Sequence, residues 1–449
     1  MQAKLWIEDL KFYFNWLKEK HPDLFHKNQL KRFLDIIDNA QIHFQDLDDI
    51  KCLKYFYEMC SLIGDGHSCI IAPNEIFPQI QYIYPLKIRT FDEGPIIFAT
   101  SKKYCNLLGT RIVKFNGLEL DDLALKIKPY LSFDNMLGFL SHFDYAICFP
   151  FIHYFAGTID KIDQVIELEL ENNITVEIEP FRFAKEKKEQ FISLFDDKNK
   201  FPNLPYYMQH CASNYFFDFI YNVSNNQDFM LQNDATKIHH IKEFDIIYAD
   251  IRKILNLKER SFRDFSREIL NQVIEKKAKI LIIDLSNNMG GNNYLNQSLY
   301  HEIIKTPEIN SLGKIFTIIS RNTFSAAANL ATNLELETWA LFVGEPTAAP
   351  ANHYSDPAMI RLPNSQLMVT SSTIRWQMND DRDLRPYIYP DVPVKLQFND
   401  LIRSKDPIIE AILNFKLSEE LKKLEDNSLP NEKWNRTNQK QIWEIFYKI

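Results

Sequence analysis

Three features of this 449-residue sequence carry residues that could do chemistry together: a serine, a glycine turn and a histidine. Ser325 stands between an apolar run at residues 315–319 and an alanine-rich stretch that begins at Ala326. This pattern predicts a strand-to-helix junction, where backbone N–H groups and the positive end of the helix dipole lie beside the hydroxyl. A serine in that setting could be the nucleophile of acyl transfer if a base takes its proton. The simpler alternative is that Ser325 only caps the helix.

A second turn of the same kind lies about 35 residues earlier. It runs from Asp284 to Gly291 and separates the apolar strand predicted at residues 280–285 from another predicted helix. Two neighbouring parallel strands would bring both turns to one edge of a sheet. Gly290 or Gly291 could then present N–H groups that form an oxyanion hole together with the N–H of Ala326. Taken alone, the glycine pair could equally be a plain strand-to-helix connection.

The candidate base is His67, which lies in a glycine turn at residues 64–68. A neutral imidazole with an ordinary pKa of about 6.5 can accept a proton at neutral pH. Polar side chains in turns also bond locally, so a structural role for His67 is the alternative. His353, in the loop predicted at residues 350–356, is the second candidate base.

Several segments resemble, in family order, those of the C-terminal-processing and tricorn-core serine peptidases, which are also called tail-specific proteases. These segments are residues 21–25, 63–68, 108–117, 284–291, 323–327, 343–347, 362–365 and 390–394. The resemblance covers nearly the whole chain. It implies an α/β fold with a crotonase-like catalytic domain, an N-terminal helical bundle and a PDZ-like β-rich insert. It implies a serine-type peptidase that needs no cofactor or metal.

The resemblance also implies which kind of base is used. One branch of the family uses a lysine downstream of the serine, but this sequence has no lysine between Lys314 and Lys395. The tricorn-like branch uses a histidine from the N-terminal region, and His67 stands in the matching turn.

In the tricorn-like branch a serine beside the histidine and an acid downstream of the nucleophile complete a relay. Ser68 and Asp383 are the residues that match these two positions. The identity of the acid stays open, because Asp381 is close to Asp383 in the sequence and Asp65 is close to His67.

Four regions are expected from the patterning of the chain. Residues 1–78 read as amphipathic helices, because apolar residues recur at helical spacing. Residues 79–165 hold short apolar strands with an Asn-Gly turn and match the PDZ-like domain. Residues 166–260 read as a connecting segment with an insertion, whose Asn-rich part at 222–234 is predicted to be a loop. Residues 261–449 alternate strands and helices, which predicts the α/β catalytic domain.

Composition excludes several classes of function. The chain has 45% hydrophobic and 25% charged residues, as soluble globular proteins do. Its net charge of −8 is spread along the sequence without a basic stripe, so nucleic acid is not an expected partner. The six cysteines lack zinc-ligand spacing and are predicted to be free and mostly buried. No leader or membrane span is visible, which favours a cytoplasmic location unless a leader has been removed.

Two functions are consistent with these observations. The first is hydrolysis of peptide bonds through an acyl-enzyme on Ser325 with His67 as general base. The second is a catalytically inactive peptide-binding protein on the same fold, motivated by Ser286, which stands where the family has arginine. An acyl-CoA enzyme of the related crotonase architecture fits less well, because it would need neither the His67 turn nor the PDZ-like insert. In the first two cases the partner is a peptide or an unfolded protein, and the oligomeric state is open.

Overall fold

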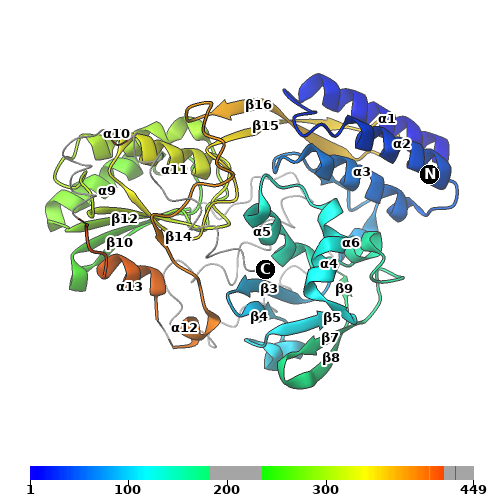
Figure 1. Cartoon of the computed structure of the whole chain (residues 1–449), viewed down its shortest axis with the longest axis horizontal. Helices are drawn as coiled ribbons and strands as arrows, with labels where there is room; N and C mark the ends of the chain where they lie inside the picture. Colours follow the sequence, from blue (N-terminus) through cyan, green and yellow to red (C-terminus); the bar gives the residue numbers. More distant parts are fainter. Residues whose placement is uncertain (183–234, 404, 419–429, 431–449) are drawn as a thin grey trace. The chain divides into compact units, whose positions relative to one another are not determined.

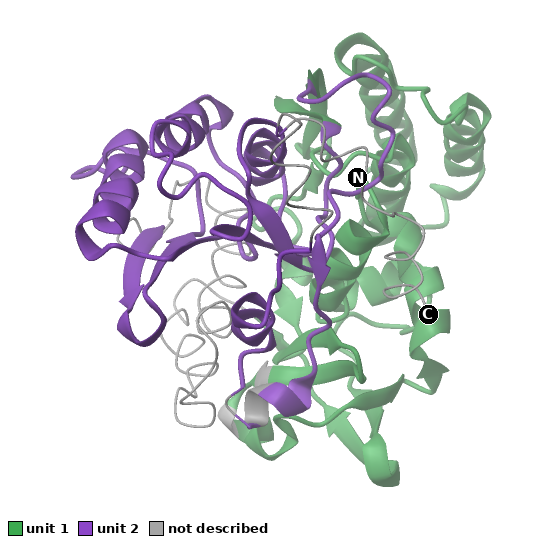
Figure 2. Ribbon diagram, turned by 60° about the vertical axis from the view of Figure 1, so that its left-hand side comes forward, with its two compact units in different colours: residues 1–202, 212–228, 353–376 green, residues 203–211, 229–352, 377–449 purple. Residues whose placement is uncertain are grey.

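The computed structural model describes residues 1–182, 235–403, 405–418 and 430. The loop predicted at residues 222–234 and Cys211 lie outside these residues. The described chain forms two compact units (Figure 2). Unit 1 holds residues 1–182 and 353–376, and unit 2 holds residues 235–352 and those after 376.

Unit 1 begins with three helices, as the helical spacing of apolar residues predicts. They are α1 (Ala3–Lys20), α2 (Leu30–His43) and α3 (Asp49–Ile63). Their apolar faces meet around Trp6, Leu17, Phe33 and Phe56, which are all at most 1% exposed. Burial of each of these side chains contributes about 2–3 kcal/mol. Helix α3 ends at Gly64, whose left-handed φ of 72° turns the chain into the segment that carries His67.

Three short antiparallel sheets follow in unit 1. The smallest pairs β2 (Tyr82–Ile83) with β9 (Phe181–Arg182). Another pairs β3 (Leu86–Phe91) with β4 (Gly94–Thr100), and the third has the order β6-β5-β7-β8. Its strands are β5 (Ile112–Phe115), β6 (Leu118–Glu119), β7 (Ile166–Leu170) and β8 (Ile174–Ile178). The predicted Asn-Gly turn joins β5 to β6, with φ of 50° at Asn116 and 78° at Gly117. Such left-handed values at both positions are what a two-residue hairpin turn requires.

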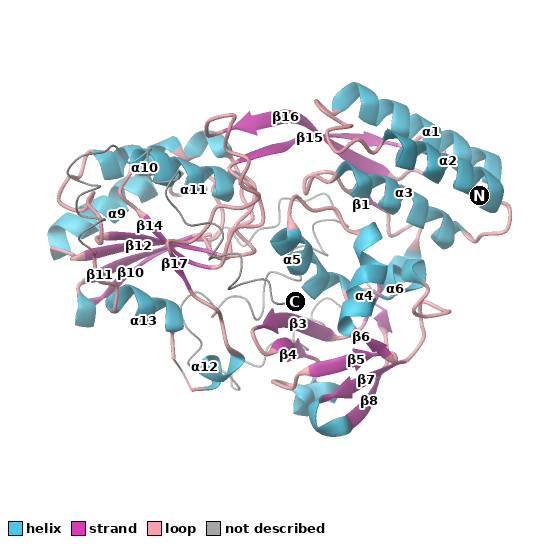
Figure 3. Cartoon of the chain, in the orientation of Figure 1, coloured by secondary structure: helices cyan, strands magenta, loops and turns pink. Residues whose placement is uncertain are grey.

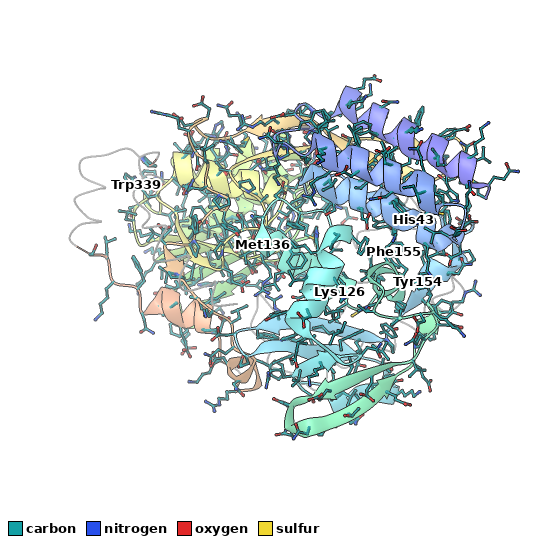
Figure 4. The ribbon with its side chains drawn as sticks, turned by 45° about the vertical axis from the view of Figure 1, so that its right-hand side comes forward. His43, Lys126, Met136, Tyr154, Phe155 and Trp339 are labelled. Atoms are coloured by element: carbon teal, nitrogen blue, oxygen red, sulfur yellow. The ribbon has the colours of Figure 1, made fainter. Side chains whose placement is uncertain are left out.

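Three further helices, α4 (Leu120–Ile127), α5 (Met136–Ala146) and α6 (Pro150–Ala156), pack in unit 1 beside these sheets. Tyr154 and Phe155 of α6 face the N-terminal helices (Figure 4). The Tyr154 hydroxyl donates to Oδ2 of Asp48 at 2.7 Å, and the Phe155 ring lies 5.3 Å from that of Tyr57. These contacts join the helical region to the β-rich region within one hydrophobic core.

Unit 1 is completed by a hairpin from much later in the chain. Strands β15 (Asn352–Arg361) and β16 (Met368–Gln377) pair with each other, and β16 pairs with β1 (Ile70–Ile71), directly after the His67 turn. The tip of the hairpin is bound by Asp9 of α1. The Asp9 carboxylate accepts hydrogen bonds from the backbone and side chains of Asn364 and Ser365, at 2.6 to 3.1 Å.

Unit 2 is built on a sheet whose strands include β10, β12 and β14 (Figure 1). The sheet has six strands in the order β10-β11-β12-β13-β14-β17. The strands are β10 (Thr236–Ile241), β11 (Ile246–Ile251), β12 (Ile280–Asp284), β13 (Ile315–Ile319), β14 (Leu341–Gly344) and β17 (Val392–Pro393). All neighbours from β11 to β17 are parallel, and only β10 runs antiparallel. Strands β11 to β14 are almost wholly buried, as their continuous apolar runs predict.

Helices cover both faces of this sheet (Figure 3). One face carries α9 (Phe262–Lys276), α10 (Gln297–Ile304) and α11 (Ala326–Glu337), and the other carries α13 (Pro407–Leu413), which follows the short α12 (Phe398–Ile402). The α/β class expected from the sequence is therefore confirmed, with strands and helices in the predicted order from residue 262 to 344.

The structure differs from the predicted regions at three places. The boundary placed at 165 falls inside a sheet, because β7 pairs with β5. The boundary placed at 260 leaves out β11, which is parallel to β12 in the main sheet. Residues 353–376, assigned to the last region, cluster with unit 1. Each difference is a pairing between segments that are far apart in the sequence.

Two further expectations concern the cysteines, predicted to be free and mostly buried, and membrane-spanning helices. Five free cysteines are described, of which Cys52, Cys60 and Cys148 are buried while Cys69 and Cys105 are exposed. None of the described helices is long and apolar enough to cross a membrane.

Candidate active site

Ser325 directly precedes α11 and has a backbone conformation that L-residues rarely adopt. Its φ is 55° and its ψ is −130°, and its side chain makes no capping hydrogen bond within the described residues of α11. A serine that served only as an N-cap would be extended, and its oxygen would accept an N–H of the first turn. Such strain costs about 1–3 kcal/mol and persists where the surroundings enforce it. The capping alternative therefore does not describe Ser325.

The two turns predicted to share one edge of the sheet are hydrogen-bonded to each other. The Ser320 hydroxyl donates to the carbonyl of Ser286 at 2.5 Å, and the Thr323 hydroxyl donates to that of Leu285 at 2.8 Å. The N–H of Phe324 donates to the carbonyl of Asn288 at 3.1 Å. Three bonds thus hold the segment before Ser325 against the glycine turn.

Close approach at both glycines requires the absence of a side chain. A Cβ on Gly290 would lie 2.7 Å from Cβ and 3.0 Å from Oγ of Ser325, and one on Gly291 would lie 2.1 Å from the carbonyl oxygen of Ile254. Both glycines also have positive φ, 113° and 143°. Gly290 is therefore the residue that leaves room for the Ser325 side chain.

The predicted oxyanion donors are not equivalent. The N–H of Gly290 donates to Oδ1 of Asn288 at 2.8 Å, and Nδ2 of Asn288 donates to the carbonyl of Ile251 at 2.8 Å. Asn288 is fully buried and so fixes the shape of the turn. Because the N–H of Gly290 is already used, those of Gly291 and Ala326 are the better candidates to bind an oxyanion.

A buried ion pair supports the loop before the serine. Nε and a terminal nitrogen of Arg321 donate to the two carboxylate oxygens of Glu345 at 3.1 and 2.5 Å. Both side chains are less than 10% exposed. Two-point contact between a planar guanidinium and a carboxylate fixes orientation as well as distance.

His67 lies in unit 1, and Asp65 organises its turn. One oxygen of the Asp65 carboxylate accepts the backbone N–H of His67 at 2.6 Å, and the other accepts the Ser68 hydroxyl at 2.7 Å. Nδ1 of His67 lies 3.9 Å from the same carboxylate. Burial alone would raise the pKa of Asp65, but His21, the field of His67 and the bond from Ser68 together hold it below its usual value.

The imidazole of His67 is held by the strand that carries the second candidate base. Its ring is hydrogen-bonded to the backbone of Tyr354 and is parallel to the ring of His353, at 4° and with centroids 5.7 Å apart. Burial lowers the pKa of His67 to about 4, although the charge of Asp65 opposes this shift. His67 is therefore neutral at pH 7 and able to accept a proton.

Asp383 belongs to unit 2, whereas Ser68 belongs to unit 1, and its partners within unit 2 are basic and amide side chains. Its carboxylate accepts two bonds from the Arg385 guanidinium, at 2.9 and 2.8 Å, and one from the Asn379 amide at 2.7 Å. The same guanidinium donates to both oxygens of Glu335 in α11. Burial would raise the pKa of Asp383, but Arg385 holds it below its usual value. Asp381, the other candidate in that segment, is exposed.

The structure brings the predicted residues together in two groups. Unit 2 gathers Ser325, Gly290, Gly291 and Ala326, and unit 1 gathers Asp65, His67, Ser68 and His353. Sequence analysis missed two residues of the second group, His21 and Tyr354. One signal could have indicated His21: it begins the segment at residues 21–25 that resembles the peptidase family, and it follows α1 directly. In the described part of the chain no group of three or more His, Cys, Asp and Glu residues could hold a metal ion.

Solved structures resemble this chain, whereas no protein-family model and no curated protein matches its sequence. A CPAF variant aligns with 95% of this chain and 98% of its own, at 11% identity and a TM-score of 0.61. The chain has the fold of CPAF. Mature CPAF aligns with 91% of this chain and 96% of its own, at 12% identity and a TM-score of 0.60. At 11–12% identity the likeness to CPAF extends to the fold, and the chemistry of the site depends on the residues of this chain.

Proposed function

We propose that this protein is a serine peptidase that hydrolyses peptide bonds through an acyl-enzyme on Ser325, with His67 as general base. The observation that carries the proposal is the strained backbone of Ser325 against Gly290, with φ of 55° at a non-glycine residue. Strain of this kind collects where a side chain is held for a task. The likeness to the CPAF fold and the resemblance of the segments to tail-specific proteases support the same assignment.

In the proposed reaction His67 takes the proton of the Ser325 hydroxyl while Oγ attacks the carbonyl carbon of the scissile peptide bond. The N–H groups of Ala326 and Gly291 stabilise the oxyanion of the tetrahedral intermediate. Its collapse breaks the C–N bond, and the leaving amine takes the proton from His67. A water molecule, deprotonated by His67, then attacks the acyl carbon; collapse of this second tetrahedral intermediate breaks the C–Oγ bond, His67 returns its proton to Oγ of Ser325, and the acid leaves.

We propose Asp65 as the acid of this relay in place of Asp383. Asp65 already accepts the Ser68 hydroxyl and the N–H of His67, and its charge raises the pKa of the imidazole. Asp383 is instead paired with Arg385, which also pairs with Glu335. The crotonase-like character of unit 2 and the PDZ-like character of residues 79–165 remain part of the proposal. They would supply the catalytic sheet and a surface for peptides.

A digest of a synthetic peptide library, read by mass spectrometry, tests the proposed function. Wild type should yield defined fragments, and Ser325→Ala should yield none, because the variant lacks the nucleophile. A binding measurement on uncleaved peptides belongs in the same experiment. Binding by both proteins with turnover by neither would refute the peptidase and favour the inactive peptide-binding protein.

A further inference from the structure

His21 contacts two residues that hold His67, the proposed base: Asp65 and Tyr354. It is the residue after α1, and the following Pro22 disfavours helical backbone at this position, which ends the helix there. Nε2 of His21 lies 3.4 Å from the Asp65 carboxylate, and neither side chain is exposed. The ring also lies 4.8 Å from that of Tyr354, whose backbone is bonded to His67.

The hydrogen bonds of His21 decide which nitrogen carries its proton. Nδ1 accepts the backbone N–H of Asp23 at 3.2 Å. A neutral imidazole that accepts at Nδ1 carries its hydrogen on Nε2, so the N–H is the group that faces Asp65. Within the described residues Nε2 makes no hydrogen bond by geometry, so its 3.4 Å contact with the buried Asp65 carboxylate is electrostatic.

Asp65 needs such a partner because it is fully buried. Its two oxygens already accept the Ser68 hydroxyl and the N–H of His67, and both bonds depend on where the carboxylate points. A buried carboxylate that loses a nearby N–H dipole is less well stabilised, and we expect it to shift toward its remaining donors. His21 thus bears on His67 by two routes, one through the Asp65 carboxylate and one through the Tyr354 ring.

We infer that His21 is a positioning residue for His67, acting chiefly through the Asp65 carboxylate. Its consequence for catalysis rests on the proposed function, but its consequence for the His67 ring does not. The residue that follows the last turn of α1 thus contributes to the group around His67.

Three variants separate the two routes. His21→Phe keeps a ring against Tyr354 but removes the N–H that faces Asp65, whereas His21→Gln keeps an amide N–H of similar reach without the ring. His26→Phe is the matched control, because the His26 ring lies 5.1 Å from that of Tyr354 while its Nδ1 contacts the carbonyl of Asp23. Each variant is measured for kcat and KM on a cleaved peptide and for its melting temperature.

The expected result is a fall in kcat of about 10- to 100-fold for His21→Phe with little change in KM, since small displacements of a catalytic group act on the chemical step. His21→Gln should recover most of kcat, and His26→Phe should match wild type. Equal kcat for His21→Phe and His26→Phe would overturn the inference. So would a loss in His21→Gln as large as that in His21→Phe.

A second readout does not need activity. Histidine-selective ¹⁵N labelling reports the tautomer of each ring, with the His67 signals assigned from His67→Gln. Wild type and His26→Phe should show one His67 tautomer and His21→Phe a mixture. If the wild type cleaves nothing but this pattern appears, the proposed function fails and the positioning role stands. A single unchanged tautomer in His21→Phe would refute the positioning role.

Discussion

At the scale of single residues, a general base must be unprotonated at the working pH and must also accept a proton readily. The surroundings of His67 affect these two requirements in opposite ways. Burial lowers its pKa to about 4, which keeps the imidazole unprotonated at neutral pH. A base of such low pKa is also a weaker proton acceptor than one whose pKa lies near the working pH. Asp65 opposes the lowering, and an imidazolium formed during the reaction would gain from the same charge.

Asp65→Asn is expected to lower kcat about 10²- to 10⁴-fold, because the relay loses the charge that stabilises protonated His67. The wild-type enzyme should be active from neutral pH down to about pH 5 and lose activity as His67 is protonated near pH 4. Since the charge of Asp65 raises the pKa of His67, its removal should move this acid limb to lower pH. Profiles of kcat/KM against pH for both proteins measure the shift, and an acid limb that moves upward would contradict the assignment.

Asp383 is expected to matter for stability. Asp383→Asn leaves Arg385 buried with one charge partner fewer, and breaking a buried ion pair costs about 3–5 kcal/mol. Asp380→Asn is the matched control, because Asp380 pairs with Arg382, which is 82% exposed, and such exposed pairs contribute little to stability. Urea unfolding of both variants gives the comparison. A fully stable Asp383→Asn protein that has lost activity would instead support Asp383 as the acid of the relay.

At the scale of elements, the nucleophile depends on how the ends of β12 and β13 are tied together. The sequence predicted these two strands, their following turns and α11, because continuous apolar runs and an alanine-rich helix leave little ambiguity. It also predicted that the turns would meet. It could not predict that the N–H of Gly290 is used by Asn288, because that bond depends on the conformation of one buried amide.

Asn288→Ala tests the importance of this amide. The change leaves the N–H of Gly290 and the carbonyl of Ile251 unpaired, at a cost of about 1–3 kcal/mol for each buried group. A lower melting temperature and a fall in kcat should appear together, because the turn also shapes the oxyanion site. Asn287→Ala, a substitution at the partly exposed neighbouring position, is the control. Wild-type kcat in a destabilised Asn288→Ala protein would show that the turn does not set the geometry of catalysis.

At the scale of the whole molecule, one segment of unit 1 comes late in the sequence, after residues 235–352 of unit 2. Residues 353–376 supply His353 and Tyr354 to the group around His67, although they lie more than 280 positions further along the sequence. Sequence patterning could not place this hairpin, because pairing between β16 and β1 leaves no local periodic signal. The same limit explains the regions whose predicted boundaries differ from the structure.

Asp9 is the anchor of this hairpin and offers a test of its place in unit 1. Asp9→Ala removes an acceptor of four hydrogen bonds and should lower the free energy of unfolding by about 2–4 kcal/mol. Hydrogen exchange in peptides from residues 353–376 should become faster. Glu8→Ala, which removes only an exposed ion pair with Lys4, is the control and should leave exchange unchanged. Unchanged exchange in both variants would mean that Asp9 does not hold the hairpin.

The central claim is that Ser325 is a nucleophile served by His67. It is tested most directly by the rate at which a fluorophosphonate probe adds to the protein, followed by intact-mass spectrometry. Wild type should gain one adduct, located at Ser325, Ser325→Ala should gain none, and His67→Gln should react at least about 100-fold more slowly. Equal labelling of wild type and Ser325→Ala, or a wild-type rate in His67→Gln, would contradict the claim.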